Sequence, residues 1–331
     1  MSDNTFKAIV VEEKGKGLFK QSIKNRSMSD LPDGDILVKV KYSSLNYKDG
    51  LSFYGNKGVS RNYPHTPGID AMGTVKNSNT PNIKIGSKVI VSGYDLGMNT
   101  AGGFGEYIRV PQGWVSILPD GLNSLDSMVI GTAGLTAGLC VNSIEVLNHV
   151  AGNKAIVTGA TGGVGCIAVK LLSKLGAEVT AVTGKKSSEE FLRSIGASKI
   201  IIRDNFIDTI KKPMNKAMWD IAIDVAGGNL LSGLIASMKY GGVVTCCGLV
   251  ADPKFDTTVF PFILRGISLI GIDSAEELIH NKTKIWANFA SKWKLENLEE
   301  LYTIVDMNGM INEIEKILNG EQVGRVVLKH A

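Results

Sequence analysis

A short apolar strand, a glycine-rich turn and a helix follow one another in the middle of the chain. Residues 154–158 have the pattern of a buried strand, residues 159–165 contain four glycines, and residues 166–175 form a helix that ends before Gly176. Such a turn brings bare backbone against a pyrophosphate, and the helix N-terminus supplies unpaired N–H groups and a positive dipole end. This order of elements predicts a dinucleotide-binding turn.

The glycine pattern departs from the strict G-x-G-x-x-G sequence. Ala160 occupies the first position, and Gly159 precedes it. By itself the motif is weak, and a structural glycine turn in another α/β fold is the alternative. The strand before it, the helix after it and a second strand at the expected distance favour nucleotide binding.

The second strand of this region, 178–182, ends in a small hydroxyl, a glycine and two cations. An NAD-specific site would place a carboxylate there for the ribose 2′-hydroxyl, whereas this chain has Thr183, Gly184, Lys185 and Lys186. A lysine neutralises a 2′-phosphate that an aspartate would repel. The residues therefore favour NADPH over NADH, although the two lysines are also compatible with a solvated helix start.

Two domains are expected from a length of 331 residues, because one hydrophobic core usually stops growing below that size. The first part alternates short β-rich runs with turn residues and predicts a small antiparallel β domain. The second part alternates strands and helices, which predicts an α/β fold with a doubly wound parallel sheet. We expect domains at 1–125 and 126–275, with 276–331 returning to the first domain.

Composition excludes several other classes of protein. The net charge of +4 comes from dispersed residues with no basic block, so no nucleic-acid partner is expected. The sequence contains no run of about 18 apolar residues, so no membrane span is predicted. The polar N-terminus does not resemble a signal peptide. Four cysteines without a disulfide framework favour the reducing cytoplasm.

The pattern of metal-binding residue types predicts that no metal is used. Zinc sites need clustered Cys and His ligands, but the histidines are dispersed at His65, His149, His280 and His330. Cys140 and Cys166 lie in apolar helical surroundings, which favours core packing over a nucleophile. Hydride transfer without a metal suits double bonds conjugated to a carbonyl, because the resulting enolate needs only hydrogen-bond donors.

Several segments together resemble one family over nearly the whole chain. They are Ser44-Leu45-Asn46-Tyr47-Lys48-Asp49, Pro67-Gly68-Ile69-Asp70, residues 102–107, residues 130–137, the glycine turn, residues 261–266, Gly271-Ile272-Asp273-Ser274 and Gly324-Arg325-Val326-Val327. The resemblance is to the acrylyl-CoA reductase group, within the quinone oxidoreductase-like branch of medium-chain dehydrogenases.

This resemblance implies a fold, a reaction and an assembly. It implies a GroES-like β-rich catalytic domain, a Rossmann NADPH-binding domain, a homodimer joined through the Rossmann sheets, and NADPH-dependent reduction of acrylyl-CoA to propionyl-CoA. In zinc-dependent relatives a cysteine ligand stands near the place of Asn46, and Gly-His-Glu stands in place of Gly68-Ile69-Asp70. The absence of both ligand types agrees with the prediction of a zinc-free enzyme.

The resemblance also implies which residues contact the cofactor. They are Tyr47, Thr161, Gly162, Gly163, Val164, Thr183, Gly184, Lys185, Arg203, Leu249, Ile263, Ser274 and Arg325. The family often has arginine at the place of Lys185, so the charge is kept but the bidentate fork is lost. For Leu249 and Ile263 ordinary core packing is the alternative, and for Arg325 a surface position on a strand.

Tyr47 and Asn46 are the candidate catalytic residues. A loop after a strand can bring Tyr47 into a cleft, where its hydroxyl would stabilise the enolate, although an isolated tyrosine is usually a half-buried core residue. Asn46 would hold ribose or thioester, with an Asx turn as the alternative. Asp49 is interpreted as a local cap or as an ion-pair partner of Lys48. Lys57, Arg61 and Arg265 are possible partners for the CoA phosphates.

Two other functions remain open on the sequence alone. An NADPH:quinone or 2-alkenal reductase would share the fold, the cofactor and the missing zinc ligands. A non-catalytic NADPH-binding sensor would bind the cofactor without oxidising it.

Overall fold

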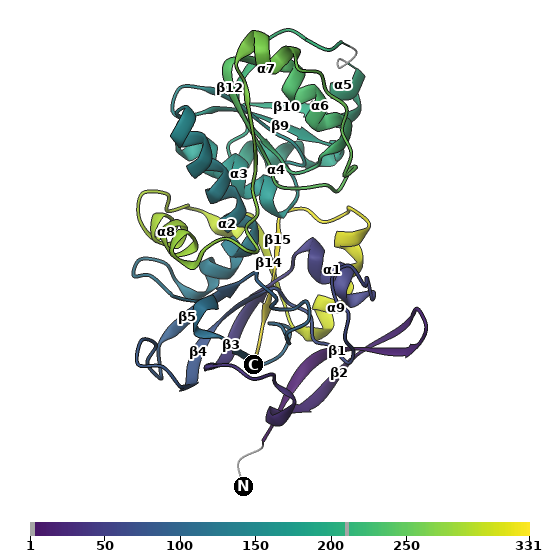
Figure 1. Ribbon diagram of the computed structural model, residues 1–331, viewed down its shortest axis with the longest axis vertical. Coiled ribbons are helices and arrows are strands. Elements are labelled where there is room, and N and C mark those ends of the chain that lie inside the picture. Colours follow the sequence, from purple (N-terminus) through teal and green to yellow (C-terminus); the bar gives the residue numbers. More distant parts are fainter. Residues whose placement is uncertain (1–3, 209–211) are drawn as a thin grey trace. The chain divides into compact units, whose positions relative to one another are not determined.

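The computed structural model describes residues 4–208 and 212–331 (Figure 1). The chain folds into two compact units. The first unit contains the chain up to Thr132, together with Ala275–Lys294 and Tyr302–Ala331, and the second contains Ala133–Ser274 and Leu295–Leu301. The first unit thus extends a few residues beyond the expected boundary at 125, and a short C-terminal stretch belongs to the second unit.

The first unit is built on a largely antiparallel sheet, as the spacing of its β-rich runs predicts. Its strands are hydrogen-bonded in the order β14-β15-β3-β4-β5-β7, and β6 also pairs with β3. Neighbouring strands are antiparallel except for the pair β14 and β15. The strands are β3 Ile36–Ser44, β4 Asp70–Ser78, β5 Lys88–Ser92, β6 Tyr107–Val110, β7 Val115–Ile117, β14 Tyr302–Val305 and β15 Arg325–Lys329, beside a hairpin of β1 Thr5–Gly15 and β2 Leu18–Ser27.

Alternating side chains on these strands form the core of the first unit. Ile36, Val38 and Val40 on β3 are buried while the residues between them are more exposed, which is the period-two pattern of a half-buried strand. Three α-helices accompany the sheet: α1 Tyr47–Phe53, α8 Ile279–Ala290 and α9 Met307–Leu318. Tyr47, expected in a loop, is instead the first residue of α1.

The second unit contains a six-stranded parallel sheet in the order β10-β9-β8-β11-β12-β13. Two βαβαβ halves meeting at β8 and β11 give this order, so the predicted doubly wound Rossmann fold is confirmed. The strands are β8 Lys154–Val157, β9 Glu178–Thr183, β10 Lys199–Ile202, β11 Trp219–Asp224, β12 Met238–Cys246 and β13 Ser268–Gly271, and the helices are α3 Gly163–Lys174, α4 Glu189–Ser194, α5 Arg203–Asp208, α6 Gly228–Ser237 and α7 Phe260–Arg265.

The long helix α2, Ser124–Leu147, is broken by a kink at Gly131. The backbone there has φ 51° and ψ −161°, a conformation open to glycine and costly for residues with a side chain. The division between the two units follows directly, after Thr132. By length and composition α2 is apolar enough to cross a membrane, but most of it is buried inside the protein, as in the core helix of a globular fold.

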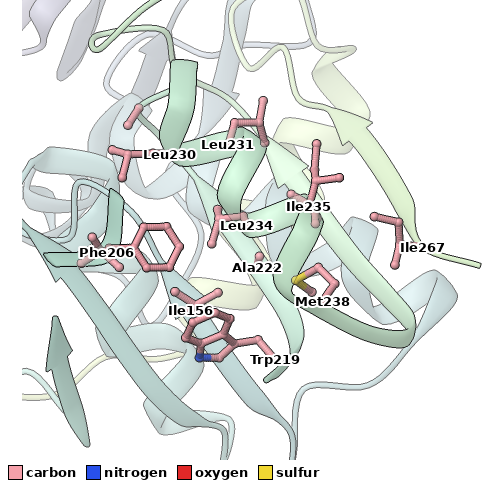
Figure 2. Close-up of a cluster of buried hydrophobic side chains, with 13 residues drawn as sticks. Ile156, Phe206, Trp219, Ala222, Leu230, Leu231, Leu234, Ile235, Met238 and Ile267 are labelled. Carbon is pink, nitrogen blue, oxygen red and sulfur yellow. The ribbon is translucent and has the colours of Figure 1, made fainter. Parts of the chain in front are cut away.

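Apolar packing holds α6 against the parallel sheet (Figure 2). Leu230, Leu231 and Leu234 on α6 are almost fully buried against a cluster that includes Ile156 on β8 and Trp219 on β11. Each buried leucine stabilises the fold by roughly 1.5–3 kcal/mol relative to an exposed one.

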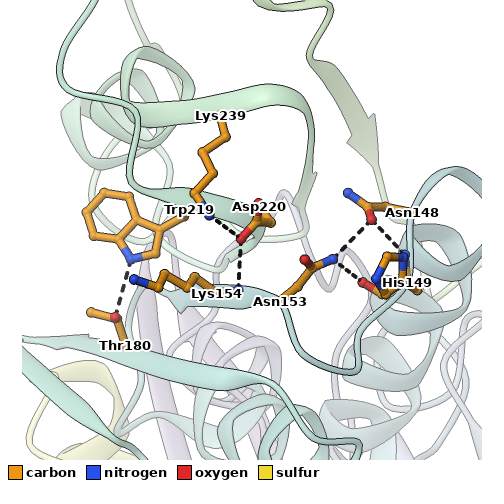
Figure 3. A network of polar contacts seen from close by, with 8 residues as sticks. All are labelled: Asn148, His149, Asn153, Lys154, Thr180, Trp219, Asp220 and Lys239. Atoms are coloured by element: carbon orange, nitrogen blue, oxygen red, sulfur yellow. Dashed lines mark hydrogen bonds and ion pairs between the residues drawn. The ribbon is translucent and has the colours of Figure 1, made fainter.

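Polar contacts join the amino-terminal ends of the same strands (Figure 3). Asp220 Oδ2 accepts the backbone N–H of Lys154 at 2.9 Å and the ammonium of Lys239 at 2.7 Å, and Trp219 Nε1 donates to Thr180 Oγ1 at 3.3 Å. At this end of the sheet, the charge of Asp220 is therefore paired with that of Lys239. The carboxyl ends of the strands, where ligands bind in such folds, are free to carry the site.

Candidate active site

The glycine turn connects β8 to α3 in the geometry that a dinucleotide requires. Gly159 has φ 56°, and a Cβ on Gly165 would lie 2.2 Å from the carbonyl oxygen of Gly159. Helix α3 can therefore approach the turn only because residue 165 has no side chain. The first N–H groups of α3, beginning at Gly163, have no acceptor inside the helix and present the positive end of its dipole.

Two cations lie at the carboxyl end of β9, where the sequence predicts the 2′-phosphate pocket. Lys185 Nζ donates to Thr161 Oγ1 of the glycine turn at 3.4 Å, and Lys185 N donates to Thr183 Oγ1 at 3.0 Å. The Arg203 guanidinium approaches Gly184, since a Cβ there would lie 3.3 Å from its central carbon. Partial burial lowers the pKa of Lys185. Lys185 thus points back to the turn and does not merely solvate a helix start.

Arg203 is exposed and forms an ion pair with its neighbour Asp204, with a distance of 3.2 Å from Nε to Oδ1. This exposed pair contributes little to stability. The guanidinium can therefore exchange this partner for a phosphate at small cost.

The residues predicted for the nicotinamide half do not belong to the core of the second unit. Leu249 is 64% exposed and Ile263, on α7, is 72% exposed, so ordinary core packing is wrong for both. Ser274 accepts a hydrogen bond from Thr136 Oγ1 at 2.6 Å. A contact of these three residues with cofactor stays a prediction.

In the first unit, Asn46 and Tyr47 stand at the junction of β3 and α1. Tyr47 is 37% exposed, so part of the residue is accessible to solvent. Asn46 is 9% exposed, and its Nδ2 donates to Asp70 Oδ2 at 2.8 Å and to the Ser44 carbonyl at 3.2 Å. The Asn46 amide is therefore held by its own unit, next to the more accessible Tyr47.

Two fully buried carboxylates surround this junction. Asp49 accepts the backbone N–H of Asn46 at 2.7 Å, of Ile69 at 2.8 Å and of Gly68 at 3.1 Å. Desolvation and, to a smaller extent, the charge of Asp70 raise the pKa of Asp49 to about 7, against the lowering effect of these bonds. The interpretation of Asp49 as a local cap holds for its bond to Asn46, but its bonds to the 68–69 turn were missed.

Asp70, the first residue of β4, joins three segments. It accepts hydrogen bonds from Ser44 Oγ at 2.6 Å, from the Asn46 amide, and from the backbone N and Oγ1 of Thr132 at 2.9 Å and 2.7 Å. Its position in the Pro67–Asp70 motif was the one sequence signal for this role.

Arg325 is 2% exposed, so the alternative of a surface strand arginine is wrong. Its guanidinium donates to the carbonyl oxygens of Val129 at 2.9 Å and Leu45 at 3.0 Å, and to Asn46 Oδ1 at 3.5 Å. A Cβ on Gly131 would lie 2.8 Å from this guanidinium and 2.9 Å from the Asp70 carboxylate. The missing side chain at Gly131 therefore makes room for both charges.

Of the cations considered for CoA phosphates, two are already engaged. Arg265 donates to the carbonyl oxygens of Asn215, Ala236 and Met238 at 2.6–3.0 Å. Lys57 pairs with Glu13 at 2.6 Å. Arg61 is exposed on the first unit.

The cysteines offer neither a nucleophile nor a ligand cluster. Cys140 and Cys166 are buried. The neighbouring Cys140 thiol and burial raise the pKa of Cys247 well above its usual value, which opposes thiolate formation. Within residues 4–208 and 212–331, no group of three or more His, Cys, Asp or Glu side chains is placed to hold a metal ion.

Comparison with protein families matches both units. Residues 32–120 match the alcohol dehydrogenase GroES-like domain, and residues 163–291 match the zinc-binding dehydrogenase family. The GroES-like and Rossmann domains implied by the resemblance are therefore confirmed. The name of the second family refers to zinc binding. In the part of this chain that the structure describes, no cluster of His, Cys, Asp or Glu side chains is placed to bind a metal ion.

Relatives and solved structures cover nearly the full chain. The acrylyl-CoA reductase AcuI of Ruegeria pomeroyi is 39% identical over 98% of both chains. The putative quinone oxidoreductase YhfP of Bacillus subtilis is 41% identical over 93% of this chain and 94% of its own, and its structure with NAD bound gives a TM-score of 0.95. The yhdH oxidoreductase of Salmonella enterica in complex with NADP is 38% identical, with a TM-score of 0.94 over 98% of this chain and 100% of its own.

Proposed function

Because this chain belongs to the acrylyl-CoA reductase group of the quinone oxidoreductase-like medium-chain dehydrogenases, we propose that it reduces acrylyl-CoA to propionyl-CoA with NADPH and without a metal. The observation that carries the proposal is the cationic end of β9: Lys185 Nζ lies 3.4 Å from Thr161 Oγ1, and the Arg203 guanidinium borders Gly184. This is the charge that a 2′-phosphate needs.

The residues of the second unit fit the cofactor on geometric grounds. The side-chain-free positions of the turn, among them Gly162 and Gly163, let the pyrophosphate approach the N-terminus of α3. Thr161, Val164 and Thr183 line the same region, and Leu249, Ile263 and Ser274 are the proposed contacts of the nicotinamide half. When bound, the reduced cofactor supplies the hydride.

In the first unit, Tyr47 is the proposed catalytic residue. Its hydroxyl would donate a hydrogen bond to the thioester oxygen and stabilise the negative charge that develops there when hydride adds to the β-carbon. Asn46 is proposed to act beside it, and Arg325 is proposed to reach a cofactor phosphate or carboxamide. Arg61, which is exposed, is the proposed partner of a CoA phosphate.

We also propose a cytoplasmic homodimer. The free cysteines suit a reducing compartment. β13 ends the parallel sheet, and exposed apolar side chains such as Val259, Phe260 and Leu264 occupy the nearby sequence. An open strand edge beside apolar surface is suited to pairing with a second copy.

A second candidate is an NADPH:quinone or 2-alkenal reductase, favoured by the 41% identity to the putative quinone oxidoreductase YhfP. A non-catalytic NADPH-binding sensor is the candidate from another class. The first would act on substrates without CoA, and the second would bind NADPH without oxidising it.

An NADPH-oxidation assay over acrylyl-CoA, free acrolein and a quinone, repeated with NADH, tests the proposal. We expect the highest kcat/KM with acrylyl-CoA and NADPH. We also expect Tyr47→Phe to lower kcat by about 100-fold, as loss of an oxyanion donor does. Equal or better rates without CoA would establish the quinone or alkenal reductase instead, and NADPH binding without any turnover would establish the sensor.

A further inference from the structure

Two buried carboxylates hold the segment that contains Asn46 and Tyr47. Asp49 and Asp70 are both fully buried, and each bonds to Asn46: Asp49 to its backbone N–H and Asp70 to its side-chain amide. Burying a carboxylate costs free energy unless it is paired and hydrogen-bonded. Asp49 thus holds the backbone of Asn46, and Asp70 holds its side chain.

We propose that Asp49 and Asp70 are positioning residues, and that Asp49 must be ionised to hold the Asn46–Tyr47 segment in its productive geometry. This inference rests on the proposed reductase function. Tyr47 follows Asn46 directly, so an error in the backbone at Asn46 is passed to the Tyr47 hydroxyl. Misplacement of a reacting group by about 1 Å can cost about 100-fold in rate.

The hydrogen bonds of Asp49 favour its ionised form. Oδ1 accepts the N–H groups of Gly68 and Ile69, and Oδ2 accepts the N–H of Asn46. All three partners are donors, so a proton on Oδ2 would find no acceptor among them and would conflict with the N–H that Asn46 donates to the same oxygen. An asparagine reproduces this conflict, because its oxygen would remain with Gly68 and Ile69 and its NH₂ would face Asn46.

The charges around Asp49 are few and can be named. Burial, and to a smaller extent the charge of Asp70 on β4, raise the pKa of Asp49 to about 7. Arg325 on β15 reaches Asn46 Oδ1, and the neighbouring helix α9 presents Leu318 to Gly50 of α1 rather than a charge. Lys48 is the half-buried neighbour on α1 itself.

Activity and stability should therefore respond to pH in opposite directions. Between pH 8 and pH 6 the folded protein takes up a proton at Asp49 that the unfolded chain does not, so the contribution of Asp49 to stability rises as the pH falls. Over the same range the ionised fraction of Asp49 falls by about tenfold. A residue with a purely structural role would not lower kcat while it raises Tm.

The experiment compares wild type with Asp49→Asn, measuring kcat, the KM for NADPH and Tm from pH 6 to pH 8 on the best substrate of the wild type. We expect kcat of wild type to fall about tenfold toward pH 6, and kcat of Asp49→Asn to be about 100-fold lower at pH 8 and independent of pH. The KM for NADPH should change less than about twofold. The difference in Tm between wild type and variant should grow in favour of wild type toward pH 6.

Asp35→Asn is the matched control, because Asp35 Oδ2 accepts one backbone N–H, from Gln112 at 3.0 Å, elsewhere in the same unit. It should leave kcat and its pH profile unchanged. If Asp49→Asn does not fold, Ser44→Ala removes one donor to Asp70 and should lower kcat by about tenfold with an unchanged KM for NADPH.

Suppose that wild type is active and that kcat of Asp49→Asn lies within about threefold of it, or still falls toward pH 6. Either result overturns the positioning role of Asp49 and leaves the proposed function intact. A wild-type kcat in Ser44→Ala overturns the role of Asp70. A wild-type protein that reduces no enoyl thioester, enal or quinone overturns the proposed function and this inference with it.

Discussion

The candidate functional residues of the two units are held by different physical means. The second unit offers main-chain N–H groups and cations at the ends of parallel strands, on a core that is apolar around Ile156 and Trp219 (Figure 2). The first unit instead buries the carboxylates of Asp49 and Asp70 together with the guanidinium of Arg325. The second unit is thus suited to binding an anion, and the first to holding a few side chains in fixed positions.

This difference determines how each unit should respond to substitution. A group that binds ligand at the surface of a fold can be removed with little loss of stability. A buried charged group cannot, because its partners remain desolvated without it. Substitutions in the first unit should therefore reduce stability and kcat, whereas those at the cationic end of β9 should reduce cofactor affinity.

Removing Arg325 should have the largest effect. Arg325→Met leaves the carbonyl oxygens of Val129 and Leu45 without this donor and leaves buried negative charge nearby, so we expect a loss of about 3–5 kcal/mol in the free energy of unfolding. Denaturant titration measures it. Arg265→Met is the matched control in the second unit, because Arg265 also donates to three carbonyl groups but is only half-buried. Equal losses in the two variants would contradict the contrast between the units.

Adding one methyl group to the glycine turn should have the next largest effect. In Gly165→Ala the new Cβ would lie 2.2 Å from the Gly159 carbonyl oxygen, so α3 must shift, at a cost of about 1–3 kcal/mol in stability. NADPH affinity should fall as the turn is displaced, which fluorescence titration measures. Gly162→Ala is the control for stability alone, because a Cβ there has its nearest contact at an ordinary 3.4 Å and should leave Tm unchanged. A Gly165→Ala protein with unchanged Tm and Kd would show that the close approach is unnecessary.

The part of the molecule that could be predicted from sequence is the part built from neighbouring residues. The glycine turn, each alternation of strand and helix, and Lys185 after β9 lie within short stretches of sequence, so their local pattern predicts the doubly wound sheet. Helix α1 was not predicted because its seven residues are too few to show the 3.6-residue periodicity of a helix. The contacts of Asp70 with Ser44 and Thr132 span 26 and 62 residues, and that of Arg325 with Leu45 spans 280. Such contacts depend on the register of the sheet, which no local pattern contains.

The smallest expected effect concerns the choice of cofactor. Lys185→Ala removes the ammonium beside Thr161 but leaves Arg203 at Gly184, so the preference for NADPH over NADH should fall by about tenfold, about 1.4 kcal/mol. Stability should hardly change, because Lys185 is only partly buried and its desolvation opposes the charged form. The ratio of kcat/KM for the two cofactors measures the preference, with the exposed Lys186→Ala as control.

If Lys185→Ala keeps the preference while Arg203→Ala loses it, the arginine alone recognises the phosphate, and the contact of Lys185 with the turn is structural. If Lys185→Ala instead lowers Tm as Gly165→Ala does, Lys185 stabilises the fold as the buried charges of the first unit do. The contrast between a ligand-binding second unit and a first unit that holds side chains in place would then be wrong.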